Sequence, residues 1–221
     1  MHSYLKNLIA GGEGQHLDFK FEISDSKKIA RTLSAFANTG GGTLLVGVKD
    51  NGRIAGVRSD EEYYMLEAAA KMYCKPEVNF AVRQWQADGK TVLEATIEKS
   101  SSPPHYARSD EGKWLAYIRV NDENILANQI MIRVWMRHNR PKGTLVRYSE
   151  TEKILFDYLR THETISLSAF QRLAKISPRK AGTILVNLIV LGIIEITFKD
   201  KKIVYTLPAK ERRDPSYSGI T

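Results

Sequence analysis

Cysteine is almost absent from this sequence: Cys74 is the only one among 221 residues. A lone thiol excludes an intramolecular disulfide framework and any zinc site built from several cysteines. The five histidines, at positions 2, 16, 105, 138 and 162, show no metal-ligand spacing. We therefore expect no metal site and no resident cofactor.

Long apolar runs are also lacking. None approaches the roughly 18–20 residues that cross a bilayer, and the first apolar residues break at Gly11-Gly12, too early for a secretory signal. Apolar residues still make up 43% of the chain, enough for real cores and too many for a disordered protein. These features predict a cytoplasmic protein that does not contact a membrane.

Acidic residues are clearly outnumbered by basic residues towards the C-terminus. Residues 141–221 carry 14 Lys+Arg against 8 Asp+Glu, a net charge of +6, whereas residues 1–140 carry 19 against 17, a net charge of +2. A basic excess concentrated on the smaller part suits a polyanion. We expect DNA as the partner, with RNA as a second candidate; the alternative is a merely soluble basic domain.

The sequence divides near Pro141-Lys142-Gly143, in a polar stretch typical of a linker. We predict an α+β protein with a mixed α/β domain at 1–138, a linker at 139–147, a smaller domain at 148–208 and a basic tail at 209–221. Within the first domain, alternating and helical apolar spacings predict strands at 16–22, 43–48, 78–86, 91–98 and 115–120, and helices at 25–38, 59–75 and 123–136.

The C-terminal part shows helix-start signals in regular order. Ser149 with Glu152 makes a capping box, a short helix is expected at 168–175, and Ser177-Pro178 begins a third helix that ends at Gly192. Two strands, at 193–198 and 202–207, then enclose a charged turn. Three helices followed by a hairpin are the arrangement of a winged helix-turn-helix.

In that arrangement the third helix enters the major groove of DNA and the hairpin tip, or wing, lies near the phosphate backbone. One face of the third helix is apolar, so its polar positions are predicted to contact DNA: Arg179, Lys180, Thr183 and Asn187. The predicted wing contacts are Lys199, Lys201 and Lys202. The alternative is a winged helix that docks on a protein or forms a homodimer.

Two segments of the first domain carry a longer pattern. Residues 13–20 are Glu-Gly-Gln-His-Leu-Asp-Phe-Lys, and residues 35–50 run from Ala-Phe-Ala-Asn-Thr-Gly-Gly-Gly to Gly-Val-Lys-Asp. Together with residues 52–56 and 117–120, they resemble the Schlafen AlbA_2 domain over roughly residues 5–135. Bacterial members of that family often carry a following winged helix. The resemblance therefore implies a non-enzymatic DNA-binding protein, a transcriptional regulator.

The glycine run joins a helix to a strand, and its exposed N–H groups could hold a phosphate or another anion. This candidate anion loop consists of Asn38, Thr39, Gly40, Gly41 and Gly42. The alternative is a structural helix cap before a buried strand. No lysine follows the glycines as in a P-loop, so we do not expect ATP hydrolysis.

The resemblance also implies an alternative, because some Schlafen relatives are metal-dependent endoribonucleases. Glu13 and Asp18 match the spacing of the family's acidic pair, Lys20 matches the basic residue after it, and Asp50 is a candidate third acid. Carboxylates of this kind could bind Mg²⁺ or Mn²⁺. A third alternative is a protein-interaction module.

Overall fold

The computed structural model of the protein describes residues 2–139 and 148–209. Contacts divide the chain between Ala127 and Asn128 into two compact units, unit 1 and unit 2, which are described separately. Apart from Asn139 and Ala209, the predicted linker and basic tail lie outside the described residues. Within the ranges described, none of the helices has the length and apolar character needed to cross a membrane.

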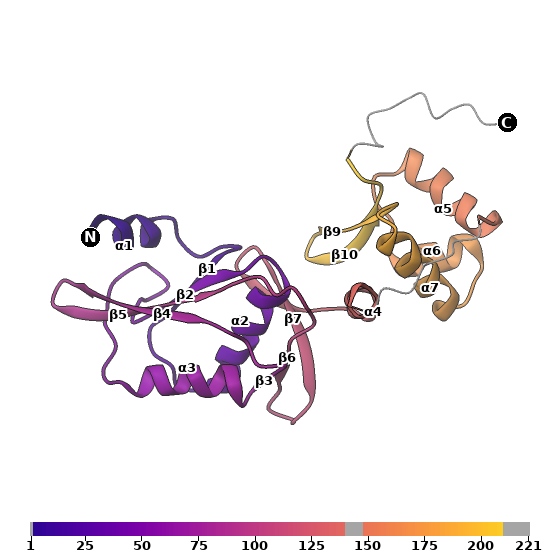
Figure 1. Ribbon diagram of the computed structural model, residues 1–221. Coiled ribbons are helices and arrows are strands. Elements are labelled where there is room, and N and C mark those ends of the chain that lie inside the picture. The colour runs from indigo at the N-terminus through magenta and orange to yellow at the C-terminus, as the bar shows by residue number, and fades with distance from the viewer. Residues whose placement is uncertain (1, 140–147, 210–221) are drawn as a thin grey trace. The chain divides into compact units, whose positions relative to one another are not determined.

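Unit 1 contains two four-stranded sheets (Figure 1). The first has the order β1-β2-β5-β4, with β1 and β2 parallel and the other pairs antiparallel. The second has the order β3-β6-β7-β8 and is antiparallel. The helices and strands of unit 1 are α1 (His2–Ala10), β1 (Leu17–Lys20), α2 (Ser26–Asn38), β2 (Gly42–Val46), α3 (Glu61–Lys71), β3 (Cys74–Lys75), β4 (Ala81–Ala87), β5 (Lys90–Ile97), β6 (Tyr106–Arg108), β7 (Trp114–Val120) and β8 (Glu123–Leu126).

Helix α2 is the centre of unit 1. Asp25 caps its N-terminus by accepting a hydrogen bond from the Lys27 N–H, as its residue type favours. Every residue from Ile29 to Asn38 except Arg31 is buried, because strands and α3 surround the helix. Leu33 and Phe36 are fully buried in the main core. The helix predicted at 25–38 is confirmed.

A second, smaller core lies around α1, where Leu5 packs with Leu17, Phe19 and Leu45. Glu94, a buried residue of β5, accepts hydrogen bonds from the Tyr4 hydroxyl at 2.9 Å and the Trp85 indole N–H at 2.6 Å. The two rings also stack. These contacts attach α1 to the sheet, an arrangement that sequence patterning did not indicate.

Unit 2 is a group of helices with a two-stranded hairpin. Its elements are α4 (Gln129–His138), α5 (Glu150–Thr161), α6 (Leu167–Ala174), α7 (Pro178–Val190), β9 (Glu195–Lys199) and β10 (Lys202–Thr206). The capping box of Ser149 and Glu152 is present, and Ser177 caps α7 with Pro178 in its first turn, as predicted. The α+β class and the order of three helices and a hairpin are confirmed.

The boundary between the units differs from the predicted one. Residues 123–136 were predicted to form one helix of the first domain, but residues 123–126 form β8, which pairs with β7, and α4 begins only after Asn128. Ile130 and Val134 of α4 are buried in the core of unit 2. The contacts therefore group α4 with α7, because its apolar face is covered there.

Candidate nucleic-acid interface

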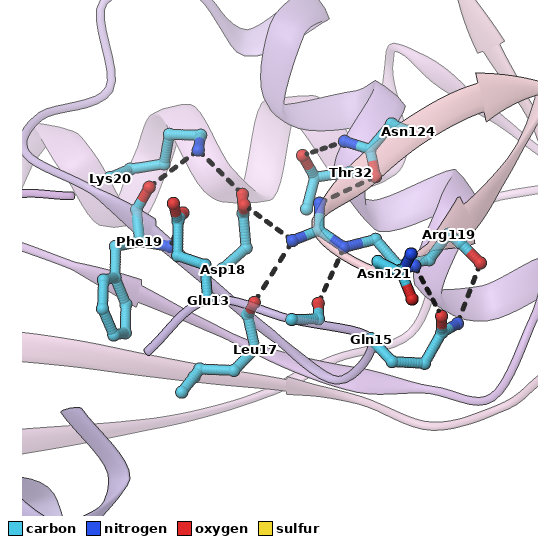
Figure 2. A network of polar contacts seen from close by, with 11 residues as sticks. Glu13, Gln15, Leu17, Asp18, Phe19, Lys20, Thr32, Arg119, Asn121 and Asn124 are labelled. Atoms are coloured by element: carbon cyan, nitrogen blue, oxygen red, sulfur yellow. Dashed lines mark hydrogen bonds and ion pairs between the residues drawn. The ribbon is translucent and has the colours of Figure 1, made fainter. Parts of the chain in front are cut away.

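Arg119 in β7 lies at the centre of a polar network in unit 1 (Figure 2). Its side chain is 1% exposed. Nε donates to the Gly14 carbonyl at 3.0 Å, Nη1 to the Asn124 side chain at 3.1 Å, and Nη2 to Asp18 Oδ1 at 3.0 Å. The guanidinium therefore joins β7 to the segment that precedes β1, and it is not available to an external ligand.

The acidic pair predicted from the resemblance lies beside this arginine. Asp18 is buried, with Oδ1 bound by Arg119 and Oδ2 at 2.8 Å from Lys20 Nζ. Lys20 Nζ also donates to the Phe19 carbonyl. Glu13 accepts a hydrogen bond from the Phe19 N–H at 2.8 Å. The structure thus brings Glu13, Asp18 and Lys20 together. The charge of Asp18 is already neutralised by Arg119 and Lys20.

The Glu13 carboxyl of this network has a raised pKa. Its burial raises the pKa above the usual range of a glutamate, and the Asp18 carboxyl beside it acts in the same direction. The Phe19 N–H and the Lys20 charge oppose that shift. The result is a pair of adjacent carboxyls in which Glu13 holds its proton more tightly than an isolated side chain would.

The predicted third acid does not complete a metal site. Asp50 lies in the turn after β2, beside Asn51 and Gly52 in a pocket that α1 also lines. In the described part of the chain, no three or more His, Cys, Asp or Glu side chains are grouped so that they could hold a metal ion. Because both oxygens of Asp18 already contact cations, the residues present do not fit Mg²⁺ or Mn²⁺.

Several polar groups of the candidate anion loop have partners within the protein. The N–H groups of Thr39 and Gly41 donate to the Phe36 carbonyl, which caps α2. The Asn38 side chain donates to the carbonyls of His105 and Tyr117 and accepts from the His105 N–H. These groups connect α2 to the second sheet.

The glycines of the same loop allow close packing. A Cβ at Gly42 would lie 2.5 Å from the Phe36 ring, and one at Gly40 would lie 2.7 Å from the His16 ring. Gly41 has a φ of +74°. Local packing and helix capping thus account for the glycine run.

The start of α7 presents a cationic surface. Arg172, Lys175, Arg179 and Lys180 are all exposed, and no acidic residue occurs between Glu163 and Glu195. None of the four side chains forms an ion pair within residues 2–139 and 148–209. Arg179 and Lys180 therefore lie where the sequence predicted them, on the open side of the helix.

Thr183 and Asn187 also lie on the solvent side of α7, but their side chains have partners. The Thr183 hydroxyl accepts from Arg133 Nη2 at 3.0 Å, and Asn187 Oδ1 accepts from Arg137 Nη1 at 2.8 Å. Both arginines belong to α4. The prediction of two free polar side chains did not include this neighbour, because α4 was assigned to the other domain.

The hairpin tip consists of Lys199, Asp200, Lys201 and Lys202, all exposed. Asp200 and Lys201 have positive φ values of 51° and 61°, as a two-residue hairpin turn with right-handed twist requires. Phe198 beside them is 37% exposed. The predicted wing residues are thus gathered at one tip.

With the boundary placed after Ala127, the difference in net charge between the two parts of the chain is larger than the sequence division gave. Residues 1–127 carry 16 Lys+Arg against 17 Asp+Glu, a net charge of −1, whereas residues 128–221 carry 17 against 8, a net charge of +9. Sequence reasoning missed Arg133 and Arg137. The absence of any acid between Glu123 and Glu150 was a signal that could have found them.

Comparison with known proteins gives a family for unit 1. A family model described as Schlafen, AlbA_2 matches residues 13–128. No curated protein matches the chain.

Two solved structures show weak similarity. One is a protein from Corynebacterium diphtheriae, with 18% identity and a TM-score of 0.46; the match covers 66% of this chain but only 35% of that protein. The other is the N-terminal domain of a protein described as related to the ATP-dependent DNA helicase RecG, from Nitrosomonas europaea. It has 21% identity and a TM-score of 0.41, with 67% of this chain and 97% of that domain covered.

Proposed function

The chain belongs to the Schlafen AlbA_2 family through residues 13–128, and from that premise we propose that it is a DNA-binding protein, a transcriptional regulator, whose unit 2 is a winged helix-turn-helix that contacts duplex DNA. The observation that carries the proposal is the charge of unit 2, a net +9 over residues 128–221. A basic unit in a chain whose other unit is nearly neutral suits a polyanionic partner.

The position of the charges supports a specific face. Arg179 and Lys180 occupy the first turn of α7, which is the part of a recognition helix that lies nearest base edges. Arg172 and Lys175 precede them on α6 and its C-cap. Because these side chains have no acidic partner in the described ranges, binding a phosphate would not require breaking an ion pair.

The wing extends the proposed contact. Lys199, Lys201 and Lys202 at the hairpin tip are proposed to lie near backbone phosphates, which contribute affinity without reading sequence. The acids of unit 2 lie elsewhere in its sequence: apart from Asp200, those among the described residues belong to α5, the α5–α6 segment and the start of β9. The proposed interface therefore combines α6, α7 and the hairpin.

The test is fluorescence anisotropy with the full chain and a labelled duplex of mixed sequence, at about 50 and 200 mM salt. Counterion release predicts a steep loss of affinity, on the order of 10³-fold for about six phosphate contacts. No detectable binding at the lower salt would contradict the proposal. A structured RNA of equal length provides a second arm: tighter binding to RNA than to the duplex would mean that DNA is the wrong partner.

The tail gives a comparison for this assay. Replacing Arg179 and Lys180 by glutamine is expected to lower DNA affinity more than replacing Arg212 and Arg213, which lie outside the described residues. The first pair is held at the start of a packed helix. A larger loss from the tail pair would place the contact outside α7.

A further inference from the structure

Two arginines of α4 lie over the exposed face of α7. Arg133 bonds to Thr183 and Arg137 to Asn187, and in both pairs the partners are 50 residues apart. Arg133 and Arg137 are four residues apart on α4, as Thr183 and Asn187 are on α7, so one face of α4 contacts one face of α7. Figure 1 shows α4 beside α7.

The close approach depends on a glycine. Gly182 of α7 is buried, and a Cβ there would lie 3.2 Å from Arg133 Nη1. A Cβ at position 182 would thus make a tight contact with the guanidinium, and its absence lets Arg133 lie close to the helix. The Thr183 hydroxyl, in turn, donates to the Arg179 carbonyl at 2.9 Å, which leaves its lone pairs directed at Arg133.

Thr183 and Asn187 are neutral, so they do not neutralise the charges of Arg133 and Arg137. No ion pair involves Arg133 or Arg137 within the part of the chain that the structure describes. The sequences of α4, α6 and α7 contain no Asp or Glu at all. The two guanidiniums are therefore uncompensated cations on the same helix surface as Lys180.

Helix α4 is fixed in place. Ile130 and Val134 are 3% and 5% exposed in the core of unit 2. Asn128 caps the helix by accepting from the Met131 N–H, and its side chain donates to the Tyr205 hydroxyl of β10 at 3.2 Å. Lifting α4 from α7 would expose this core, so we treat the α4–α7 surface as a permanent one.

We propose that Arg133 and Arg137 bind backbone phosphates of duplex DNA, with Thr183 and Asn187 as positioning residues that hold the two guanidiniums over α7. This inference rests on the DNA-binding function proposed above and adds α4 to its interface. Each arginine keeps further N–H donors for a phosphate beyond the one given to its neutral partner. Four residues of helix separate the two by about 6 Å along α4, so they reach different phosphates.

Prior positioning favours this binding. A free arginine loses rotamer freedom when it contacts a ligand, and this loss weakens binding. Hydrogen bonds to Thr183 and Asn187 restrict that freedom before DNA arrives. The neutral acceptors Thr183 and Asn187 are consistent with phosphate binding by the two arginines. A carboxylate at either position would compete with the phosphate for the guanidinium.

The main test compares the salt dependence of duplex binding by the full chain and by R133Q/R137Q. Each lost phosphate contact should lower the slope of log K against log salt by about 0.9, so we expect a decrease of about 2 and an affinity loss on the order of tenfold or more, equal on different sequences. The matched control is K153Q/R160Q on α5, which removes the same charge from another exposed helix of unit 2. It should leave the slope nearly unchanged.

Three further variants test the positioning role and keep the result independent of folding. N187D supplies a carboxylate to Arg137 and should lower the slope by about 1. T183V should lower affinity several-fold with the slope retained, and T183S, which keeps the hydroxyl, should restore the affinity.

The outcomes are distinguishable. If the wild type binds DNA but R133Q/R137Q has an unchanged slope and affinity, the inference fails and the proposed function stands. Tighter binding by R133Q/R137Q would also overturn it, because α4 would then obstruct α7. No binding by the wild type would instead refute the proposed function.

Discussion

Arg119 and Asp18, 101 residues apart in the sequence, form an ion pair of 3.0 Å whose side chains are only 1% and 6% exposed. A buried pair of this kind is costly to break, because removing one partner leaves a desolvated charge behind. Asp18, which matches the spacing of the family's acidic pair, is thus paired within the protein with Arg119 and Lys20.

We predict that Arg119→Met lowers the free energy of unfolding by about 3–5 kcal/mol, since Asp18 would keep only Lys20. Arg58→Met is the control, because its ion pair with Glu22 is exposed and should contribute at most about 1 kcal/mol. Urea denaturation of both variants provides the measurement. Equal destabilisation by the two would show that the buried pair has no special weight.

Glu13 makes stability depend on pH. Its pKa is raised in the folded protein, so the folded state binds this proton more tightly than the unfolded state does. The stabilisation is therefore present below the unfolded pKa of about 4.3 and is lost as pH rises through the raised value. Glutamine cannot ionise, so the Glu13→Gln variant lacks this pH dependence. Over that range, the free energy of unfolding of the variant relative to the wild type should therefore rise as pH increases. A difference independent of pH would contradict this assignment.

Cys74 should be inert in the folded protein. It is 4% exposed, and burial raises the pKa of its thiol to about 12. Since the thiolate is the reactive form, alkylation at pH 8 should be slow in buffer and fast in denaturant. Mass spectrometry after timed exposure to iodoacetamide would measure both rates. Rapid labelling without denaturant would place Cys74 at an accessible site.

The assignment of α4 to unit 2 predicts the behaviour of fragments. A fragment of residues 128–221 should unfold cooperatively, whereas residues 141–221 lack Ile130 and Val134, whose burial contributes about 1.5–3 kcal/mol each. Thermal unfolding followed by circular dichroism would compare the two. The same midpoint for both fragments would mean that α4 does not belong to this core.

Local signals in the sequence predicted much of unit 2. The Ser149 capping box and the Ser177-Pro178 helix start act within a few residues, so they could be identified without knowing the fold. The same holds for Asp25 at the start of α2. The helix predicted at 123–136 was wrong in its first residues, because β8 forms by pairing with β7 and its own sequence pattern does not indicate a strand. Asn128, a favoured N-cap residue, was the local signal for the true start of α4.

The candidate site was harder to predict, because its partners are distant in sequence. Nothing near Asp18 indicated that Arg119 would neutralise it. Likewise, helical periodicity placed Thr183 and Asn187 on the open face of α7 correctly, but it carried no information on Arg133 and Arg137. Patterns within an element predict which face is exposed, whereas contacts between elements decide what lies over it.

The central claim is that the first turn of α7 contacts DNA. Its most direct test is the duplex affinity of full-length R179Q/K180Q, measured by fluorescence anisotropy at about 100 mM salt beside the control K27Q/K28Q. The control removes the same charge from the first turn of α2 in unit 1. We predict a loss on the order of tenfold or more for R179Q/K180Q and wild-type affinity for the control. Equal affinities for the two variants would contradict the account.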